Sequence, residues 1–72
     1  MTNTVYELTA AVALNAAARA AGVDVTEITD HEIRLSEGYY EIRFTGKWAR
    51  YDCFVDAATG FVPGLMSAPL AA

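Results

Sequence analysis

Two side chains in this sequence have the chemistry that enzymes and metal sites use most often. His31 is the only histidine and stands between Asp30 and Glu32, and Cys53 is the only cysteine. A histidine beside carboxylates suggests a metal ligand or a general base, and a lone thiol suggests a nucleophile. On a strand, however, neighbouring side chains point to opposite faces, so His31 cannot converge with both carboxylates. We expect His31 to be an ordinary, partly buried strand residue.

The cysteine and the other carboxylates give no stronger candidate. The strand register derived below directs Cys53 into the core beside Tyr40, with no cation on that face to lower its pKa, so an inert buried thiol is expected. A single cysteine excludes an intramolecular disulfide and a multi-cysteine zinc site. Asp52 and Asp56 share a strand face but lie roughly 13 Å apart, too far for a hydrolytic carboxylate pair. The sequence predicts no catalytic residue, no metal site and no cofactor.

Composition indicates one small domain without a nucleic-acid footprint. The chain has 72 residues, of which 54% are hydrophobic, so stability must come from packing, which can include a second copy. Its net charge is −4 with five Lys and Arg in total, which argues against nucleic acid. Met1 to Leu8 holds Glu7 and no basic residue, and Asn15 and Arg19 interrupt the next apolar stretch, so neither a signal peptide nor a membrane span is predicted. If Met1 is the native start, a cytoplasmic location is expected.

An alanine-rich run predicts one helix. Residues 9–21 read TAAVALNAAARAA, alanine is the strongest helix former, and Gly22 follows where a left-handed C-terminal cap is expected. Thr9 is one candidate N-cap, whereas Thr4 and Glu7 have capping-box spacing and would start the helix earlier. The predicted inward face is Ala13, Ala16, Ala17, Ala20 and Ala21, opposite Asn15 and Arg19. Because this face is thin, a sheet must supply the bulk of the core.

After Gly22 the hydrophobic period changes to two, which predicts strands. A two-residue hairpin loop at Glu37 and Gly38 satisfies both faces of the first pair of strands at once. The apolar pairs are Leu35 with Tyr40 and Ile33 with Ile42, and the charged pairs are Arg34 with Glu41 and Glu32 with Arg43. These pairs fix the register of the first hairpin.

A second two-residue turn is expected at Gly46 and Lys47, because glycine favours the first position of a type II′ turn. This register pairs Phe44 with Ala49, Ile42 with Tyr51 and Tyr40 with Cys53. It also sets Arg43 against Arg50 and Glu41 against Asp52, and these like-charge pairs count against the loop length.

The remaining residues predict a tight turn and a short last strand. In the sequence DAATG, Asp56 is expected to accept backbone N–H groups and Gly60 to supply a positive φ. Phe61 and Val62 are expected to form a last strand that Pro63 and Gly64 end, while the tail LMSAPLAA packs on the domain edge or frays. The predicted fold is α+β: one N-terminal alanine-rich helix packed on one face of a three- to four-stranded antiparallel β-meander.

The sheet face turned away from the helix carries the functional hypothesis. Large aromatic residues stand there among charges, which is the composition of a protein interface, and a two-layer domain has no element to cover that side. The candidate interface is Tyr39, Glu41, Arg43, Trp48, Arg50, Asp52 and Phe54. The alternative is that the three aromatics pack on one another or on the C-terminal tail.

The order of these features resembles the PepSY family, named for peptidase propeptides and a spore-cortex protein. The resemblance runs from Leu8 to about Val62. It is carried by Ala21-Gly22-Val23, Tyr40-Glu41-Ile42 with Phe44, Gly46-Lys47, Tyr51, and Val55-Asp56-Ala57-Ala58-Thr59-Gly60 before Phe61-Val62. The last segment looks like the family's V/I-D-A-x-T-G-x-V hallmark, so Asp56, Ala57, Thr59 and Gly60 would form a structural turn. Pro63-Gly64 departs from the family, whose final strand often continues there.

The resemblance implies a non-enzymatic domain with a helix on a small antiparallel sheet. Such domains occur in propeptides that restrain or chaperone a secreted peptidase and as modules of the cell envelope. We therefore expect an N-terminal segment at 1–8, the PepSY-like domain at 9–62 and a tail at 63–72. The leading hypothesis is a module that inhibits or regulates a protein partner such as a peptidase through the outer sheet face or an exposed strand edge. The alternative is a homodimer through the outer face, and an enzyme based on Cys53 or His31 comes last.

Overall fold

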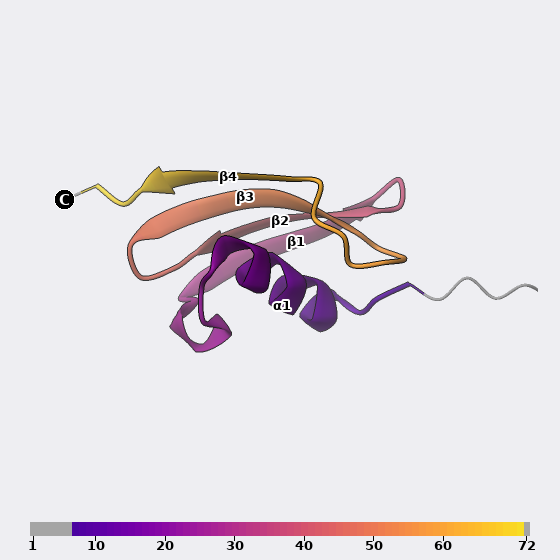
Figure 1. Cartoon of the computed structure of the whole chain (residues 1–72), viewed down its shortest axis with the longest axis horizontal. Helices are drawn as coiled ribbons and strands as arrows, with labels where there is room; N and C mark the ends of the chain where they lie inside the picture. Colours follow the sequence, from indigo (N-terminus) through magenta and orange to yellow (C-terminus); the bar gives the residue numbers. More distant parts are fainter. Residues whose placement is uncertain (1–6, 72) are drawn as a thin grey trace, which may run out of the picture.

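One helix lies across one face of an antiparallel sheet in the computed structural model, which describes residues 7–71 (Figure 1). The elements are α1 (Ala10–Ala21), the 3₁₀ turn η1 (Val25–Glu27), β1 (Asp30–Ser36), β2 (Tyr39–Thr45), β3 (Ala49–Asp56) and β4 (Gly64–Pro69). The strands pair in the order β1-β2-β3-β4, so each lies beside its neighbour in sequence. The predicted α+β meander is confirmed, with four strands.

Both ends of α1 are capped by residues that the sequence predicts, Thr9 at the N-terminus and Gly22 at the C-terminus. The Thr9 hydroxyl accepts a hydrogen bond from the Val12 N–H at 3.2 Å, so Thr9 is the N-cap, while the alternative start at Thr4 lies outside the described residues. Gly22 adopts φ 72°, a left-handed conformation that glycine enters without steric cost. The helix therefore ends where the alanine run ends.

The inward face of α1 differs from the predicted face at two positions. Ala13 and Ala17 are buried as expected, but Ala20 is exposed and Ala18 is buried. After the C-cap the chain turns back, and the Val23 N–H donates to the Ala18 carbonyl at 2.9 Å. The returning chain thus covers Ala18, and Ala20 remains in solvent.

The β1–β2 hairpin has the predicted loop and register. Ile33 lies opposite Ile42, and Arg34 lies opposite Glu41 with an ion pair of 2.9 Å. The loop residues Glu37 and Gly38 both have positive φ, 51° and 83°, as a two-residue loop of type I′ requires. Glu32 does lie opposite Arg43 in the register, but Arg43 makes its ion pair with Asp52 of β3 instead.

The predicted turn between β2 and β3 is wrong by one residue. The Gly46 N–H donates to the Ala49 carbonyl at 2.9 Å, so Lys47 and Trp48 form the loop. The resulting register pairs Phe44 with Tyr51, Ile42 with Cys53, Tyr40 with Val55 and Arg43 with Asp52. The predicted like-charge pairs are thereby avoided, and the ring of Phe44 stacks on that of Tyr51 with centroids 5.0 Å apart.

Packing, rather than the turn itself, favours a glycine at position 46. A Cβ atom at this position would lie 3.2 Å from Cε2 of Tyr51, which is tighter than ordinary van der Waals contact. The glycine therefore lets the Tyr51 ring close over the end of the hairpin. This explains why a glycine stands beside the turn and not inside it.

The turn at DAATG is confirmed, whereas the predicted last strand is wrong. Asp56 Oδ1 accepts hydrogen bonds from the N–H groups of Ala58 at 2.8 Å and Thr59 at 3.1 Å, and Gly60 adopts φ 81°. Phe61 and Val62 are not in a strand; the strand is β4, which begins only at Gly64. Of the two outcomes expected for the tail, the first is found: the tail packs on the edge of the domain, where β4 pairs along β3 as a strand.

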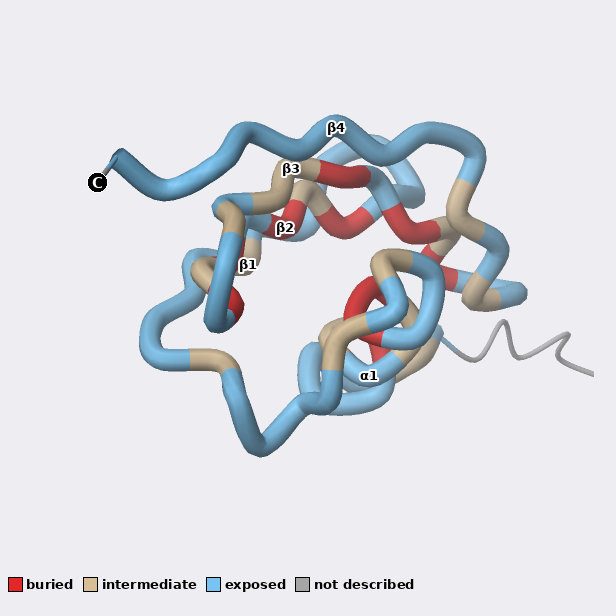
Figure 2. Tube along the Cα trace, turned by 60° about the vertical axis from the view of Figure 1, so that its left-hand side comes forward, coloured by how far each residue is buried: buried red, intermediate tan, exposed pale blue. Residues whose placement is uncertain are grey.

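The core lies between α1 and the two central strands, as the buried segments in Figure 2 show. Its buried members are Ala13, Ala17, Tyr40, Ile42, Phe44, Cys53, Val55 and Ala57. No residue of β4 is buried, and β1 contributes only the half-buried Ile33. The small alanine face of the helix thus lets the aromatic and branched side chains of β2 and β3 fill the space beneath it.

Candidate interaction groove on the outer sheet face

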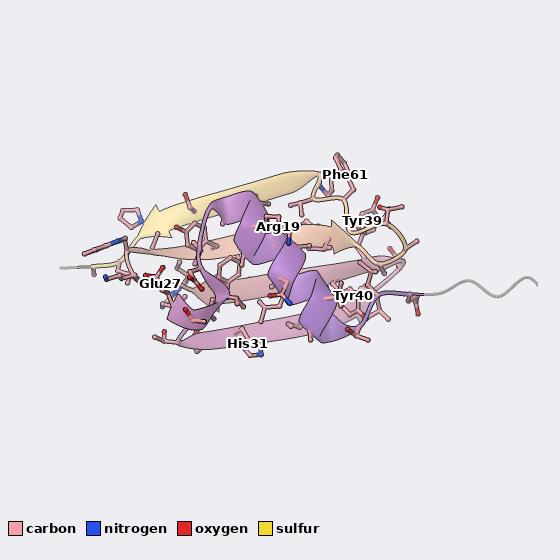
Figure 3. The ribbon with its side chains drawn as sticks, turned by 60° about the horizontal axis from the view of Figure 1, so that its bottom comes forward. Arg19, Glu27, His31, Tyr39, Tyr40 and Phe61 are labelled. Atoms are coloured by element: carbon pink, nitrogen blue, oxygen red, sulfur yellow. The ribbon has the colours of Figure 1, made fainter. Side chains whose placement is uncertain are left out.

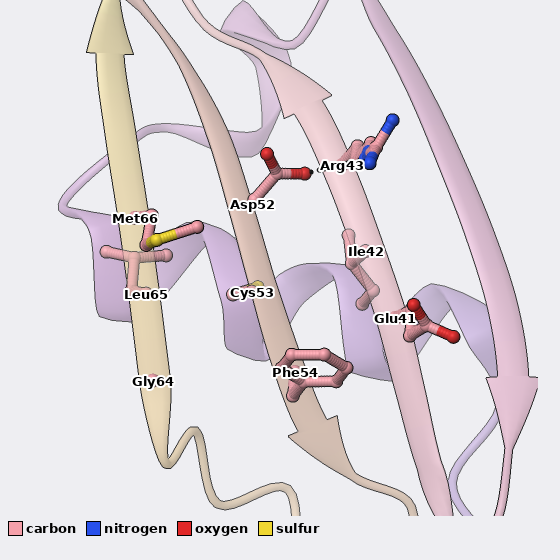
Figure 4. A pocket seen from close by; sticks show the side chains of 9 residues that line it. All are labelled: Glu41, Ile42, Arg43, Asp52, Cys53, Phe54, Gly64, Leu65 and Met66. Atoms are coloured by element: carbon pink, nitrogen blue, oxygen red, sulfur yellow. Dashed lines mark ion pairs between the residues drawn. The ribbon is translucent and has the colours of Figure 1, made fainter.

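A shallow groove of about 400 Å³ runs over β2, β3 and β4 on the face away from α1 (Figure 4). It forms because side chains of alternate residues stand on this face, while the backbone of the residues between them forms its floor. Its lining consists of Glu41, Ile42, Arg43, Asp52, Cys53, Phe54, Gly64, Leu65 and Met66. The exposed lining is mostly apolar.

Phe54 and Met66 supply the apolar walls of the groove. Phe54 lies opposite Gly64 of β4, and its ring is 49% exposed although it belongs to a central strand. Met66 lies opposite Asp52 and is 71% exposed. Because Gly64 has no side chain and nothing lies within 4 Å of its missing Cβ, the space beside Phe54 is open. A bound apolar group would find one aromatic and one flexible thioether surface here.

Charged side chains line the opposite side of the groove as ion pairs across the strands. Arg43 Nε lies 2.9 Å from Asp52 Oδ1, and Arg34 lies 2.9 Å from Glu41. Each pair joins two neighbouring strands and is largely exposed, so each contributes no more than about 1 kcal/mol to stability. The groove therefore has an apolar half over β3 and β4 and a polar part formed by Glu41 of β2 and by the ion pair between Arg43 of β2 and Asp52 of β3.

The structure brings together four of the seven residues predicted for the interface. Glu41, Arg43, Asp52 and Phe54 all line the groove. The other three are Tyr39 at the start of β2, Arg50 opposite Ala68, and Trp48. Trp48 lies in the β2–β3 loop, 76% exposed, with Lys47 Nζ 5.3 Å from its ring. The expectation that Trp48 stands on the sheet face fails because the turn lies one residue further along the chain.

Sequence reasoning missed the contribution of β4. Gly64 and Met66 line the groove, yet the sequence pattern predicts that the sheet ends at Pro63-Gly64. A proline removes a backbone donor but can precede a strand, so it marks a boundary without saying on which side the strand lies. The absence of any charge in residues 61–72 was the available signal, because a solvated tail is usually more polar.

The residues with catalytic chemistry lie apart from one another. His31 is on the edge strand β1 (Figure 3) and is exposed rather than partly buried. Cys53 is buried in the core as predicted, but opposite Ile42 and not Tyr40. Burial raises the pKa of the Cys53 thiol to about 11, and the adjacent Asp52 carboxylate adds to the rise. The thiol is therefore protonated at neutral pH.

Residues 7–71 contain neither a metal-binding cluster nor a membrane-spanning helix. The side chains placed there include no group of three or more His, Cys, Asp or Glu that could hold a metal ion. In the same part of the chain, no helix has both the length and the apolar character needed to cross a membrane.

The fold and the groove define a class of protein: a small α+β domain whose helix covers one sheet face and leaves the other open. Residues 7–62 match the family model of the peptidase propeptide and YPEB domain, PepSY. The match spans most of the chain, and the chain belongs to this family. Domains of the family are generally non-catalytic and are associated with peptidase propeptides and regulation. No curated protein and no solved structure matched the chain.

Proposed function

We propose that this chain is a non-enzymatic module that binds a protein partner in the outer groove and thereby regulates it. The observation that carries the proposal is the apolar groove between Phe54 and Met66, on a sheet face that α1 does not cover. A peptidase is the first candidate partner, since peptidase propeptides are one source of the family.

The groove suits an extended partner segment with mixed chemistry. An apolar side chain would pack between Phe54 and Met66, where it replaces water on both sides. Polar groups of the same segment would meet Glu41 and the Arg43–Asp52 pair, which lie on the far side of the groove. A central apolar anchor with a polar rim is the usual arrangement of a protein interface.

The contribution of Phe54 to binding follows from its exposed area. A phenylalanine side chain contributes roughly 200 Å² of surface, and about half of that is exposed here. Covering about 100 Å² at about 25 cal/mol per Å² gives about 2.5 kcal/mol. Phe54→Ala should therefore raise the Kd of a partner by about 60-fold.

A matched control on the opposite layer makes the experiment specific. Val12 is 47% exposed, close to Phe54, but it lies on α1. Immobilised wild-type, Phe54→Ala and Val12→Ala domains are incubated with extract of the native host, and the retained proteins are quantified by mass spectrometry. A partner of the groove is retained by wild type and Val12→Ala and lost with Phe54→Ala, and its Kd and any peptidase activity are then measured with purified components. If the two variants retain the same proteins equally, the groove is not the binding surface.

Self-association through the same outer face is the competing function. It predicts that Phe54→Ala lowers the mass of the purified protein in sedimentation, whereas a groove for a different protein leaves that mass unchanged. The uncovered Phe54 is the observation that favours either use of the face.

A further inference from the structure

We propose that two copies of this chain pair antiparallel along β4 and join their sheets into one of eight strands. The contact concerned is the backbone edge of β4, which adjoins the outer groove and shares Met66 with it, and the proposal does not depend on the partner suggested above. It rests on the chemistry of that edge, on the backbone groups that the edge leaves unpaired and on the symmetric placement of its two prolines.

The two edges of the sheet differ in how they are protected. The edge strand β1 carries the charged residues Asp30, Glu32 and Arg34, and such charges discourage pairing with another strand. The other edge, β4, reads GLMSAP and has no charge. Every residue of β4 is exposed, and Figure 2 shows this strand outside the buried layer. Although the chain has a net charge of −4, a second copy that pairs at this edge meets no like charge that would repel it.

The pairing of β3 with β4 determines which backbone groups of β4 are free. The Leu70 N–H donates to the Trp48 carbonyl at 3.1 Å, in the same register that pairs Arg50 with Ala68 and Asp52 with Met66. Hydrogen-bonded pairs alternate along an antiparallel ladder, so the residues between them direct their N–H and C=O groups to the free edge. These residues are Leu65, Ser67 and Pro69. Leu65 and Ser67 thus each offer one donor and one acceptor, and Pro69 offers an acceptor alone.

The two prolines of this edge are placed symmetrically about Met66. Pro63 and Pro69 stand three residues before and three residues after it, and neither has an N–H to donate. An antiparallel copy centred on Met66 would pair Leu65 with Ser67 of the second chain, and Ser67 with its Leu65. Four backbone hydrogen bonds result, every free donor of the edge is used, and the prolines end the pairing at both sides. Such self-complementarity is what a two-fold interface requires.

The geometry of this dimer places like faces together. A two-fold axis through Met66 perpendicular to the sheet leaves both helices on one face and both outer grooves on the other. Met66 lies on the outer face, so it would pack directly against its symmetry mate. Leu65 points to the helix side, where it is exposed and α1 does not cover it, and the second copy would cover it. The two grooves would then adjoin across the axis and form one longer binding face.

A single short edge gives a small interface, so the dimer is expected to be weak. It lies below the roughly 1,200 Å² of a standard stable complex, and a Kd in the range of tens to hundreds of micromolar is expected. Sedimentation equilibrium of the wild-type protein up to about 1 mM covers this range. Because the edge carries no charge, the Kd should not rise when salt increases from 0.05 to 0.5 M.

Ser67→Pro removes the free donor without touching the ladder to β3. Ser67 lies in a non-hydrogen-bonded pair with Tyr51, so its N–H points outward, and it does not line the groove. By symmetry, two of the four bonds are lost and the Kd of the dimer should rise by at least about 30-fold. Ser67→Thr keeps the N–H and is the matched control. Far-UV circular dichroism and the thermal midpoint show whether each variant keeps the fold.

A charge exchange at Met66 supplies a second test with its own rescue. Met66→Lys and Met66→Glu each place like charges on the axis, so each variant alone should be monomeric, and an equal mixture should recover the dimer. A wild-type protein that is monomeric at about 1 mM overturns the proposal. So does a dimer that persists unchanged in Ser67→Pro, or a mixture of the two Met66 variants that does not associate. If Ser67→Pro abolishes the dimer while Phe54→Ala alone abolishes partner capture, the edge and the groove act independently.

Discussion

The same substitution, phenylalanine to alanine, can be made at three positions of this chain that differ in how far the side chain is buried. Phe44 in the core is 1% exposed, Phe54 in the groove is 49% exposed and Phe61 beside β4 is 66% exposed. Each is changed to alanine, so the atoms removed are identical and the lost stability depends on how much of the ring the fold covers.

The expected losses follow from the covered area. A phenylalanine side chain has roughly 200 Å² of surface, and about 25 cal/mol is gained per Å² buried. Phe44→Ala should then cost about 5 kcal/mol, Phe54→Ala about 2.5 and Phe61→Ala about 1.7, as upper estimates. The first value agrees with the range of about 3 to 5 kcal/mol for buried phenylalanine, and Phe44 also loses its stacking on Tyr51. A domain of 72 residues has roughly 4 to 11 kcal/mol in total, so Phe44→Ala should leave a partly unfolded protein.

Urea denaturation followed by far-UV circular dichroism measures these differences. Fluorescence is a poor probe, because Trp48 is already largely exposed in the fold and should change little on unfolding. The loss in the free energy of unfolding is expected to be much larger for Phe44→Ala than for Phe54→Ala, and larger for Phe54→Ala than for Phe61→Ala. A Phe54→Ala variant as unstable as Phe44→Ala would show that this ring is fully covered, which would refute the open groove and the function built on it.

Three further predictions concern the buried thiol and the DAATG turn. The Cys53 thiol should react with Ellman's reagent at neutral pH only after urea unfolding, and rapid reaction of the folded protein would contradict the buried position. The pKa of this thiol is raised from 9.0 to about 11 in the folded protein. The stability that the protonated thiol contributes is therefore fully present below about pH 9 and is lost as the pH rises towards 11. Cys53→Ala should lack this part of the alkaline decline in the urea midpoint. Gly60→Ala should lower the free energy of unfolding by about 1 to 2 kcal/mol in urea titration, because φ is 81° and a Cβ would lie 3.3 Å from Leu8 Cδ1. Gly64→Ala is the control and should be nearly neutral, because nothing lies within 4 Å of its Cβ position. Equal effects of the two substitutions would refute the strain at Gly60.

Local patterns predicted most of the helix and the first hairpin. Alanine propensity and Gly22 set the bounds of α1, and alternation together with the loop at Glu37 and Gly38 set the β1–β2 register. These features depend on residues close in sequence, so a single chain contains enough information to place them.

Errors occurred where distant packing decides the outcome. The turn between β2 and β3 follows the stacking of Phe44 on Tyr51 and the pairing of Arg43 with Asp52, and glycine preference at Gly46 gave the wrong residue. The like-charge pairs of the predicted register were a usable warning. The strand β4 has no alternating pattern because it is exposed on both faces, so periodicity could not find it. Without β4, the sequence could not predict the side of the apolar groove that Gly64, Leu65 and Met66 form.

The contacts of Leu8 have a consequence for how the chain folds. Its N–H donates to the Ala57 carbonyl at 2.7 Å, and its carbonyl accepts from the Tyr40 hydroxyl, 32 residues away in sequence. All strand pairings, by contrast, join neighbours along the chain and require only short loops to close. Since closing a long loop costs more entropy, we expect the hairpins to form first and the Leu8 segment with α1 to dock late. In hydrogen exchange, the central strands would then resist opening longest, and the start of the helix would open as a separate, less stable unit.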